Sequence, residues 1–152
     1  MTGSLSPITD CVPQLIATAT LVINSSGSSF IEITHEVMRF VTESRAKDGA
    51  PFLFARHTSA SLIIQENADP DVRAAILRAR SSALHPRLPT GFTEGPDDMP
   101  AHVKTMLTGV SLHVPVIGGA LALGTWQGIY VAEHRARPHR REIVLQFIGS
   151  RL

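Results

Sequence analysis

Apolar residues alternate with polar ones at strand spacing in some segments of the chain and recur at helical spacing in others. The strand-like runs are rich in β-branched residues and lie at 15–23, 29–33, 51–57, 61–66, 110–117, 120–123, 125–134 and 142–149. Helical spacing begins at Thr34, at Asp69-Pro70 and at Asp98, where Thr or Asp can cap a helix. Turn residues at 24–28 and at Gly118-Gly119 predict two hairpins. These elements predict an α+β fold, mainly antiparallel sheet with two or three helices.

The helix expected from Asp98 to Gly109 carries the first candidate for chemistry. We expect Val103, Met106 and Leu107 to form its buried stripe. His102 follows Asp98 by one helical turn, so both side chains can face one ligand. The alternative is that Asp98 only caps the helix and His102 is an ordinary surface residue.

Composition limits the possible functions. The 152 residues are 43% hydrophobic, enough for one globular domain, which we place at 11–152 after a frayed lead at 1–10. A net charge of +1 and only six Phe, one Trp and one Tyr argue against a nucleic-acid partner. Cys11 stands alone, which excludes a disulfide within the chain. We see no secretory signal or apolar run of membrane-spanning length, and expect a cytoplasmic protein without a membrane partner.

A histidine and three hydroxyls fall together in the bend between two predicted strands. His57, Thr58, Ser59 and Ser61 can direct donors at an anion such as phosphate. The alternative is that the hydroxyls only satisfy the turn. A serine nucleophile is disfavoured, because the chain has no Gly-x-Ser-x-Gly turn.

Two further polar groups lie at the ends of predicted strands. Glu66 and Asn67 have no evident structural duty beside Asp69, which we interpret as a helix cap. Trp126 and Gln127 lie between glycines that let a ligand or another backbone approach closely. Glu133 continues a strand of residues that can be buried, so it lies either at the strand end or near a partner charge. Arginines then crowd a hairpin at 135–141, which is either an exposed tip or a phosphate site.

These segments closely resemble the YjbQ-like family, often named secondary thiamine-phosphate synthase. The residues that carry the resemblance are His57-Thr-Ser-Ala-Ser61, Glu66-Asn-Ala-Asp-Pro-Asp-Val72, Glu94-Gly-Pro-Asp-Asp-Met-Pro-Ala-His102, Leu123-Gly-Thr-Trp-Gln-Gly-Ile129 and Glu133-His-Arg135. The resemblance implies a compact α+β sandwich, a homotrimer, and a cleft that gathers the polar motif residues. It also implies a weak transferase that joins a pyrimidine pyrophosphate to a thiazole phosphate.

The family resemblance, together with the chemistry of the side chains, implies a role for each candidate site residue. The expected catalytic residues are His57, Glu94, Asp98, His102 and Glu133. The expected substrate-binding residues are Thr58, Ser59, Ser61, Glu66, Asn67, Asp97, Trp126, Gln127 and Arg135.

We expect a divalent metal ion, Mg²⁺ or Zn²⁺, with His57, Asp98 and His102 as its ligands. Gly91 stands where the family usually has a further histidine, so another group must complete the set. His113 alternates with the apolar residues of its strand and is expected to face solvent or an interface.

Three functions remain open from the sequence. The first is the transferase, with Asp97 and Asp98 holding Mg²⁺ on the departing pyrophosphate. The second is a non-catalytic or regulatory binding protein for a phosphorylated metabolite, which the glycine at position 91 favours. The third is metal-assisted hydrolysis of a phosphoester at the same residues.

Overall fold

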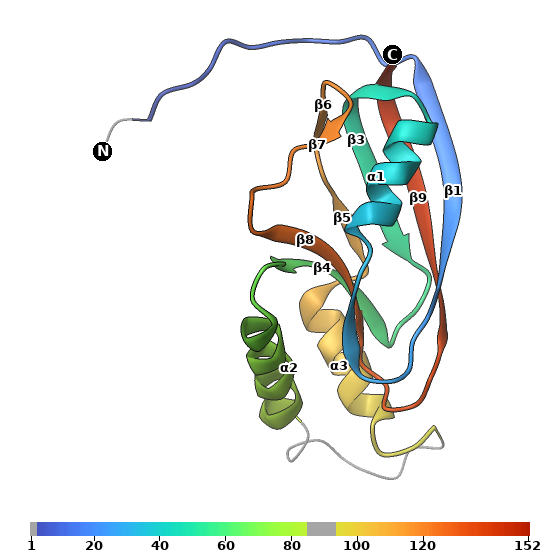
Figure 1. Cartoon of the computed structure of the whole chain (residues 1–152). Coiled ribbons are helices and arrows are strands. Elements are labelled where there is room, and N and C mark those ends of the chain that lie inside the picture. Colours follow the sequence, from blue (N-terminus) through green and yellow to red (C-terminus); the bar gives the residue numbers. More distant parts are fainter. Residues whose placement is uncertain (1–2, 85–93) are drawn as a thin grey trace.

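The computed structural model describes residues 3–84 and 94–152, with side chains left aside at 80–84 (Figure 1). Its elements in chain order are β1 (Leu15–Asn24), β2 (Ser29–Glu32), α1 (Thr34–Glu43), β3 (Ala46–Ala55), β4 (Ala60–Glu66), α2 (Pro70–Leu84), α3 (Asp98–Thr108), β5 (Ser111–His113), β6 (Val116–Ile117), β7 (Ala120–Leu121), β8 (Gln127–Glu133) and β9 (Arg140–Arg151). The predicted α+β class with mainly antiparallel sheet is confirmed.

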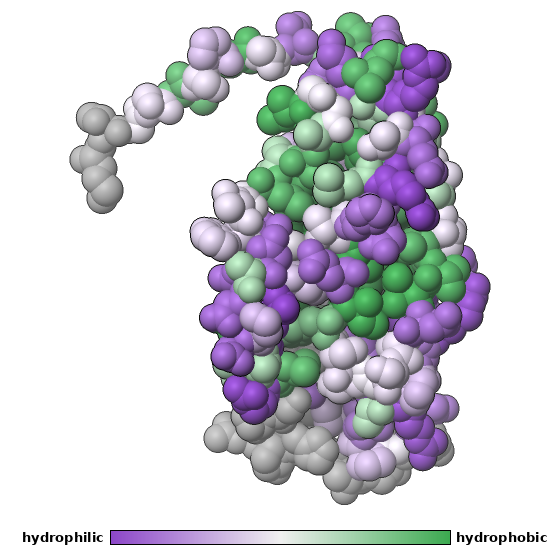
Figure 2. Space-filling model, viewed as in Figure 1, coloured by the Kyte–Doolittle hydropathy of each residue, from purple (hydrophilic) through white to green (hydrophobic). Residues whose placement is uncertain are grey.

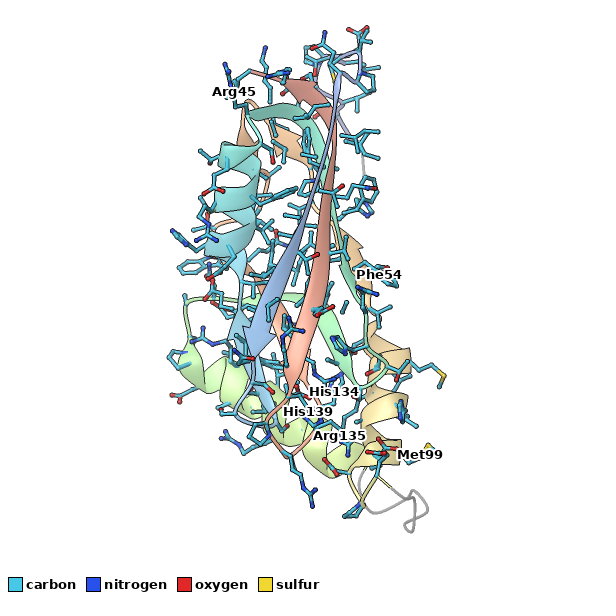
Figure 3. The ribbon with its side chains drawn as sticks, turned by 90° about the vertical axis from the view of Figure 1, so that its right-hand side faces the viewer. Arg45, Phe54, Met99, His134, Arg135 and His139 are labelled. Atoms are coloured by element: carbon cyan, nitrogen blue, oxygen red, sulfur yellow. The ribbon has the colours of Figure 1, made fainter. Side chains whose placement is uncertain are left out.

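The strands form two antiparallel sheets. Sheet A has the order β1-β9-β3-β6-β7, with β5 also paired to β3, and sheet B has the order β2-β8-β4. Helix α1 covers one face of sheet A, and α2 and α3 lie beside sheet B (Figure 1). The opposite face of sheet A carries no helix in the described part of the chain, and Phe54 points away from α1 on that side (Figure 3).

The core lies where α1 and the two sheets meet. Alternation along β9 turns Ile143, Leu145 and Phe147 inward, and all three are buried. Val37 and Val41 of α1 pack into the same cluster. Burial of this apolar surface is the main force that holds the sheets together.

Residues 24–28 do not form the predicted hairpin, and that prediction was wrong. β1 pairs with β9 in sheet A, whereas β2 pairs with β8 in sheet B. The arginine-rich segment after Glu133 likewise crosses between the sheets, because β8 and β9 belong to different ones. The Gly118-Gly119 hairpin is confirmed by the pairing of β6 with β7.

Two boundaries differ from the sequence prediction. β3 begins at Ala46 rather than at the predicted residue 51, because α1 already ends at Glu43. Thr34 is the first helical residue and not the cap; its hydroxyl accepts from the backbone N–H of Ile129. The helix start is thereby fixed by a contact with sheet B.

The predicted buried stripe of α3 was also wrong. Met106 and Leu107 are 77% and 68% exposed, and the buried side chains are Pro100, Ala101, Lys104 and Thr105. α3 packs on β4, where the hydroxyl of Thr108 meets that of Ser61, so the helix rests on its more polar side.

The surface is mixed in character. Figure 2 shows polar side chains over much of the face that carries α1, with an apolar area beside the lower end of β1. Of the helices in the described ranges, none combines the length and apolar character needed to cross a bilayer.

The close approach of β3 and β9 at Gly149 gives a stability prediction. A Cβ on Gly149 would lie 2.2 Å from the carbonyl oxygen of Asp48 and 2.7 Å from the ring of Phe147. We expect Gly149→Ala to lower the free energy of unfolding by about 3 kcal/mol, because backbone and ring must both shift. Urea denaturation measures this, with Gly3→Ala as the control, since a Cβ at Gly3 meets nothing within 4 Å. Equal stability of the two variants would contradict the packing described.

Candidate functional site

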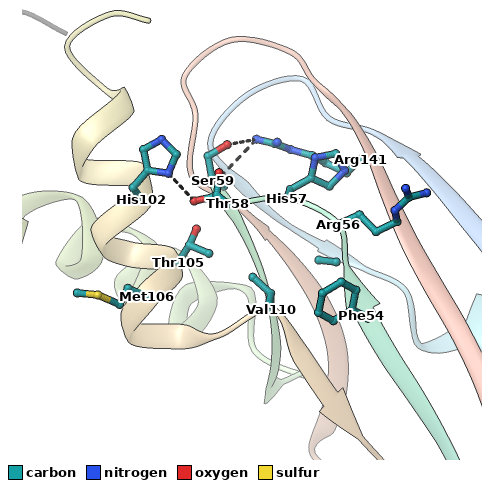
Figure 4. Close-up of a pocket in the computed structure, with 11 residues that line it drawn as sticks. Phe54, Arg56, His57, Thr58, Ser59, His102, Thr105, Met106, Val110 and Arg141 are labelled. Carbon is teal, nitrogen blue, oxygen red and sulfur yellow. Dashed lines mark hydrogen bonds between the residues drawn. The ribbon is translucent and has the colours of Figure 1, made fainter.

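A pocket of about 640 Å³ opens between α3 and the bend that joins β3 to β4 (Figure 4). It is lined by Phe54, Ala55, Arg56, His57, Thr58, Ser59, His102, Thr105, Met106, Val110 and Arg141. One wall is polar, with two histidines and two arginines, and the other is apolar. Four predicted site residues line it, namely His57, Thr58, Ser59 and His102.

His57 is fixed as a neutral donor at the polar wall. Its Nε2 accepts a hydrogen bond from the backbone N–H of Glu142 at 2.7 Å. Burial, together with the nearby Arg141 guanidinium, lowers the pKa of His57 below its ordinary value. The neutral ring must therefore carry its proton on Nδ1.

Glu133 and Arg141 form a buried ion pair behind the same wall. Glu133 is fully buried and receives Arg141 Nε at 2.7 Å and Nη2 at 2.6 Å. The Ser25 hydroxyl and the backbone N–H of Arg135 also donate to this carboxylate, at 2.9 Å each. Burial raises the pKa of Glu133, but these donors outweigh it and leave the pKa below its usual value. Glu133 is thus an anchor for Arg141 rather than an exposed base.

Arg141 reaches the pocket from this anchor. Its Nη2 lies 3.2 Å from the Ser59 hydroxyl and 3.3 Å from the Ser59 carbonyl oxygen. Within the described part of the chain, no hydrogen bond uses Nη1 of Arg141. This nitrogen therefore remains a donor that a ligand can use.

His102 joins α3 to the bend. Its Nδ1 lies 2.8 Å from the carbonyl oxygen of Thr58, which can only accept, so Nδ1 carries the proton. Its Nε2 lies 3.4 Å from Oδ1 of Asp98, and the prediction that these two side chains share a helix face is confirmed. The N-cap of the helix is Asp97 rather than Asp98.

Arg135 binds Asp97 and Asp98, the two carboxylates that were expected to hold a metal ion. Its Nε lies 3.2 Å from Asp97 Oδ2, and its Nη1 lies 2.6 Å from Asp98 Oδ1. Its Nη2 donates to the backbone carbonyl of Glu94. Glu94 itself is exposed and does not line the pocket. Burial raises the pKa of Asp97, but hydrogen bonds from Ala136 and Arg135 outweigh it and leave the pKa lowered. Arg135 is therefore a clamp on the start of α3.

Ser61 lies beneath the pocket and does not line it. It is fully buried, with Oγ 2.7 Å from His134 Nε2 and 2.5 Å from Thr108 Oγ1. This chain of polar groups ties β4, α3 and the end of β8 together. Ser61 therefore contacts α3 through Thr108 and is not among the residues that line the pocket.

The remaining predicted residues lie at the far end of sheet B. Glu66 pairs with Gln127 in β4 and β8, six residues along from the Ala60–Glu133 pair at the pocket end. Six residues of strand span about 20 Å. Asn67 binds the backbone of Gln127 at this end, and Trp126 is 64% exposed. One chain therefore does not bring these four residues to the pocket.

The residues present do not fit a metal ion as they are arranged. In the ranges 3–84 and 94–152, no three His, Cys, Asp or Glu side chains are grouped to hold one. His57 has its Nε2 lone pair engaged, and Asp98 is bound by Arg135. Position 91, where the family usually has histidine, lies outside the described residues. The divalent metal stays a prediction.

Sequence reasoning missed the apolar wall and Thr105. Phe54 and Val110 were predicted only as strand residues, and Met106 as core. Thr105 follows His102 by three residues, so helical spacing could have placed both on one side of α3. No local pattern identified Arg141, among several nearby arginines, as the partner of Glu133.

Fold and site define an α+β protein of two antiparallel sheets with a histidine- and arginine-lined pocket. The chain belongs to the family described as UPF0047 protein YjbQ-like, whose model matches residues 19–150. It is 47% identical over 132 residues to the UPF0047 protein sll1880 of Synechocystis, covering 86% of this chain and 90% of that protein. It is 36% identical over 134 residues to YjbQ of Escherichia coli O157:H7, covering 86% and 96% respectively.

Solved structures share the fold of this chain. A YjbQ/UPF0047 family protein of Clostridium acetobutylicum superposes with a TM-score of 0.78 at 35% identity, covering 85% of this chain and 98% of that one. A protein of Sulfolobus solfataricus, described as YbjQ-like and of unknown function, has a TM-score of 0.77 at 24% identity, covering 90% of this chain and 100% of that one, and shows the shared fold alone.

The Glu133–Arg141 pair gives a second stability prediction. Glu133→Gln leaves the buried Arg141 cation without its counter-charge. We expect a loss of about 4 kcal/mol in the free energy of unfolding, measured by urea denaturation. The matched control is Glu43→Gln, which breaks the exposed pair with Arg39 and should change stability by less than about 1 kcal/mol. A loss no larger than the control's would show that the pair is not an anchor.

Proposed function

We propose that the pocket binds a phosphorylated nitrogen heterocycle and that the protein is a transferase of the thiamine-phosphate synthase type. The observation that carries this proposal is the division of the pocket into two walls. His57, Arg141 and Arg56 can meet an anionic group, whereas Phe54 and Val110 can pack against a flat ring. A cytoplasmic location, where phosphorylated metabolites occur, belongs to the same proposal.

The reaction joins two phosphorylated rings. The thiazole nitrogen bonds to the methylene carbon of the pyrimidine while the carbon–oxygen bond to pyrophosphate breaks. Negative charge then grows on the departing pyrophosphate. The Nδ1–H of His57 and the Nη1 group of Arg141 are the donors placed to stabilise that charge.

His102 is the proposed general acid, which gives a proton to the departing pyrophosphate; the thiazole nitrogen has no proton to lose when it forms the new bond. His102 lines the pocket, and the Thr58 carbonyl keeps the proton on Nδ1 so that Nε2 is the atom able to exchange one. Asp98 Oδ1 lies 3.4 Å from this Nε2. Asp97 and Asp98 position α3 through Arg135 in this proposal, in place of the metal role expected from the sequence.

A binding or regulatory role is the second candidate. The pairing of Arg135 with Asp97 and Asp98 favours it, because Arg135 already hydrogen-bonds both carboxylates and no carboxylate is among the residues described as lining the pocket. The phosphoester hydrolase gains no specific support, since the described pocket lining contains no carboxylate that could activate water.

The decisive assay is formation of thiamine phosphate from the pyrimidine pyrophosphate and the thiazole phosphate. His102→Ala should lower kcat/KM by about 100-fold, because a positioned acid–base group contributes that much or more. His35→Ala, an exposed histidine of α1, is the matched control and should match wild type. Parallel arms with Mg²⁺ and with EDTA test the metal.

Each alternative outcome of this assay has its own meaning. Saturable binding of the pyrimidine pyrophosphate without product would move the function to binding or regulation. Phosphate release without the thiazole acceptor would indicate hydrolysis. Equal turnover by His102→Ala and wild type would remove His102 from the mechanism.

We propose further that the protein works as a homotrimer through the open face of sheet A. Register places Ile16 opposite Ile148 and Phe54 opposite Val144 on this face, and Phe52 shares it. Ile16, Phe52 and Phe54 are 69%, 46% and 50% exposed, more apolar surface than a solvated sheet face usually leaves uncovered. Phe54 also lines the pocket, so a neighbouring subunit on this face would narrow its mouth.

Light scattering after size-exclusion chromatography tests the assembly. Phe52→Asp should convert a trimer to monomer, because it buries a charge in the contact. Met38→Asp, on α1 and 50% exposed, is the matched control and should leave the mass unchanged. A monomeric wild-type protein would end this proposal.

A further inference from the structure

Thr105 has a buried hydroxyl with no hydrogen-bond partner in the described part of the chain. The residue is 6% exposed, yet it lines the pocket between α3 and the β3–β4 bend (Figure 4). A buried hydroxyl without a partner has lost its hydrogen bonds to water and has formed none in the protein, which costs free energy. Such an atom in a pocket indicates a group that a ligand completes.

Other threonines on helices of this protein avoid this condition. Thr42 donates to the carbonyl of Met38, and Thr108 donates to the carbonyl of Lys104, each four residues earlier. The equivalent bond from Thr105 would reach Ala101, and it is not formed. The side chain instead points its hydroxyl towards Thr58 of the bend that borders the pocket (Figure 4).

Thr105 lies where the two walls of the pocket meet. His102 precedes it by one turn on the polar side, and Met106 and Val110 follow on the apolar side. Arg141 and His57 supply the anion donors from the strands across the pocket, so the hydroxyl is not needed for a phosphate. A neutral hydroxyl that both donates and accepts suits a ring nitrogen or an amino group.

We infer that Thr105 is a specificity-determining residue that hydrogen-bonds an uncharged polar atom on the ring of the ligand. This inference rests on the proposed function and adds which part of the ligand is recognised. The ligand then has an anionic end at His57 and Arg141 and a nitrogen heterocycle whose edge meets Thr105. A site built to pair with such an edge rejects rings that lack it.

Calorimetric titration with two probes separates the ring from the anion. The probes are inorganic pyrophosphate and the pyrimidine pyrophosphate, which share the anion and differ in the ring. Thr105→Val keeps the shape of the side chain and removes the hydroxyl. We expect it to weaken the pyrimidine pyrophosphate about tenfold and to leave inorganic pyrophosphate unchanged.

Two further variants and one stability measurement test whether the effect comes from the Thr105 hydroxyl itself. Thr105→Ser keeps a hydroxyl and should retain most of the affinity. Thr42→Val on α1 is the matched control outside the pocket and should bind both probes as wild type does. Thr105→Val should unfold at an equal or higher urea concentration than wild type, because it removes an unsatisfied buried group.

The outcomes that overturn the inference differ from those that overturn the proposed function. Equal weakening of both probes by Thr105→Val, or no weakening of either, would show that the hydroxyl does not recognise the ring. Equal affinity of the wild-type protein for both probes would also show that Thr105 does not recognise the ring, but it would leave the proposed anion site in place. Failure of the wild-type protein to bind either probe would remove the proposed function, and the inference with it.

Discussion

The buried ion pair between Glu133 and Arg141 is the interaction on which the pocket depends. Glu133 ends β8 in sheet B and Arg141 lies at the start of β9 in sheet A, so the pair joins the two sheets. Two buried charges are stable only when each is paired and hydrogen-bonded. The Ser25 hydroxyl and the backbone N–H of Arg135 also donate to the Glu133 carboxylate, and the Ser59 hydroxyl accepts from the Arg141 guanidinium. The bend that carries the polar wall is thereby held against both sheets.

The next residues of the same segment extend this anchor to α3. Arg135 follows Glu133 by two positions and binds Asp97 and Asp98 at the start of the helix. The helix in turn places His102 against the Thr58 carbonyl, so His102 and Arg141 both contact the bend that borders the pocket. Most acidic residues that the sequence marks as chemical thus hold the surrounding elements in place, and the polar side chains that line the pocket are imidazoles, guanidiniums and hydroxyls.

The sequence predicts the kind of fold but not its sheet pairing. Periodicity located most strands and the start of α2 at Pro70, and Gly118-Gly119 identified a true hairpin because that signal is local. Residues 24–28 have turn composition as well, yet they carry the chain from one sheet to the other. A turn signal shows that a strand stops; only tertiary contacts decide which strand it joins.

The candidate site was predictable to the same extent: its local geometry could be read from the sequence, but its tertiary contacts could not. The spacing of Asp98 and His102 follows from helical geometry and was predictable. The face of α3 was not, because Lys104 and Thr105 are polar and their burial depends on partners and space beyond the helix. Glu133 was recognisable as a charge in need of a partner, but the choice of Arg141 among nearby arginines is set by the crossing between sheets. Glu66 and Gln127 looked equivalent to the pocket residues in sequence and lie about 20 Å along the strands.

The charges around the pocket decide what kind of ligand it can distinguish. Arg56 is paired with Glu142, Arg141 with Glu133, and His57 is held neutral by its surroundings. A pocket whose arginines each have a carboxylate partner attracts anions less at long range than one with unpaired arginines, since net charge governs that attraction. It holds an anion instead through a few directed N–H groups at short range. Recognition therefore depends on shape and hydrogen-bond geometry, and an otherwise unused hydroxyl such as that of Thr105 gains weight in choosing among rings that carry the same phosphate.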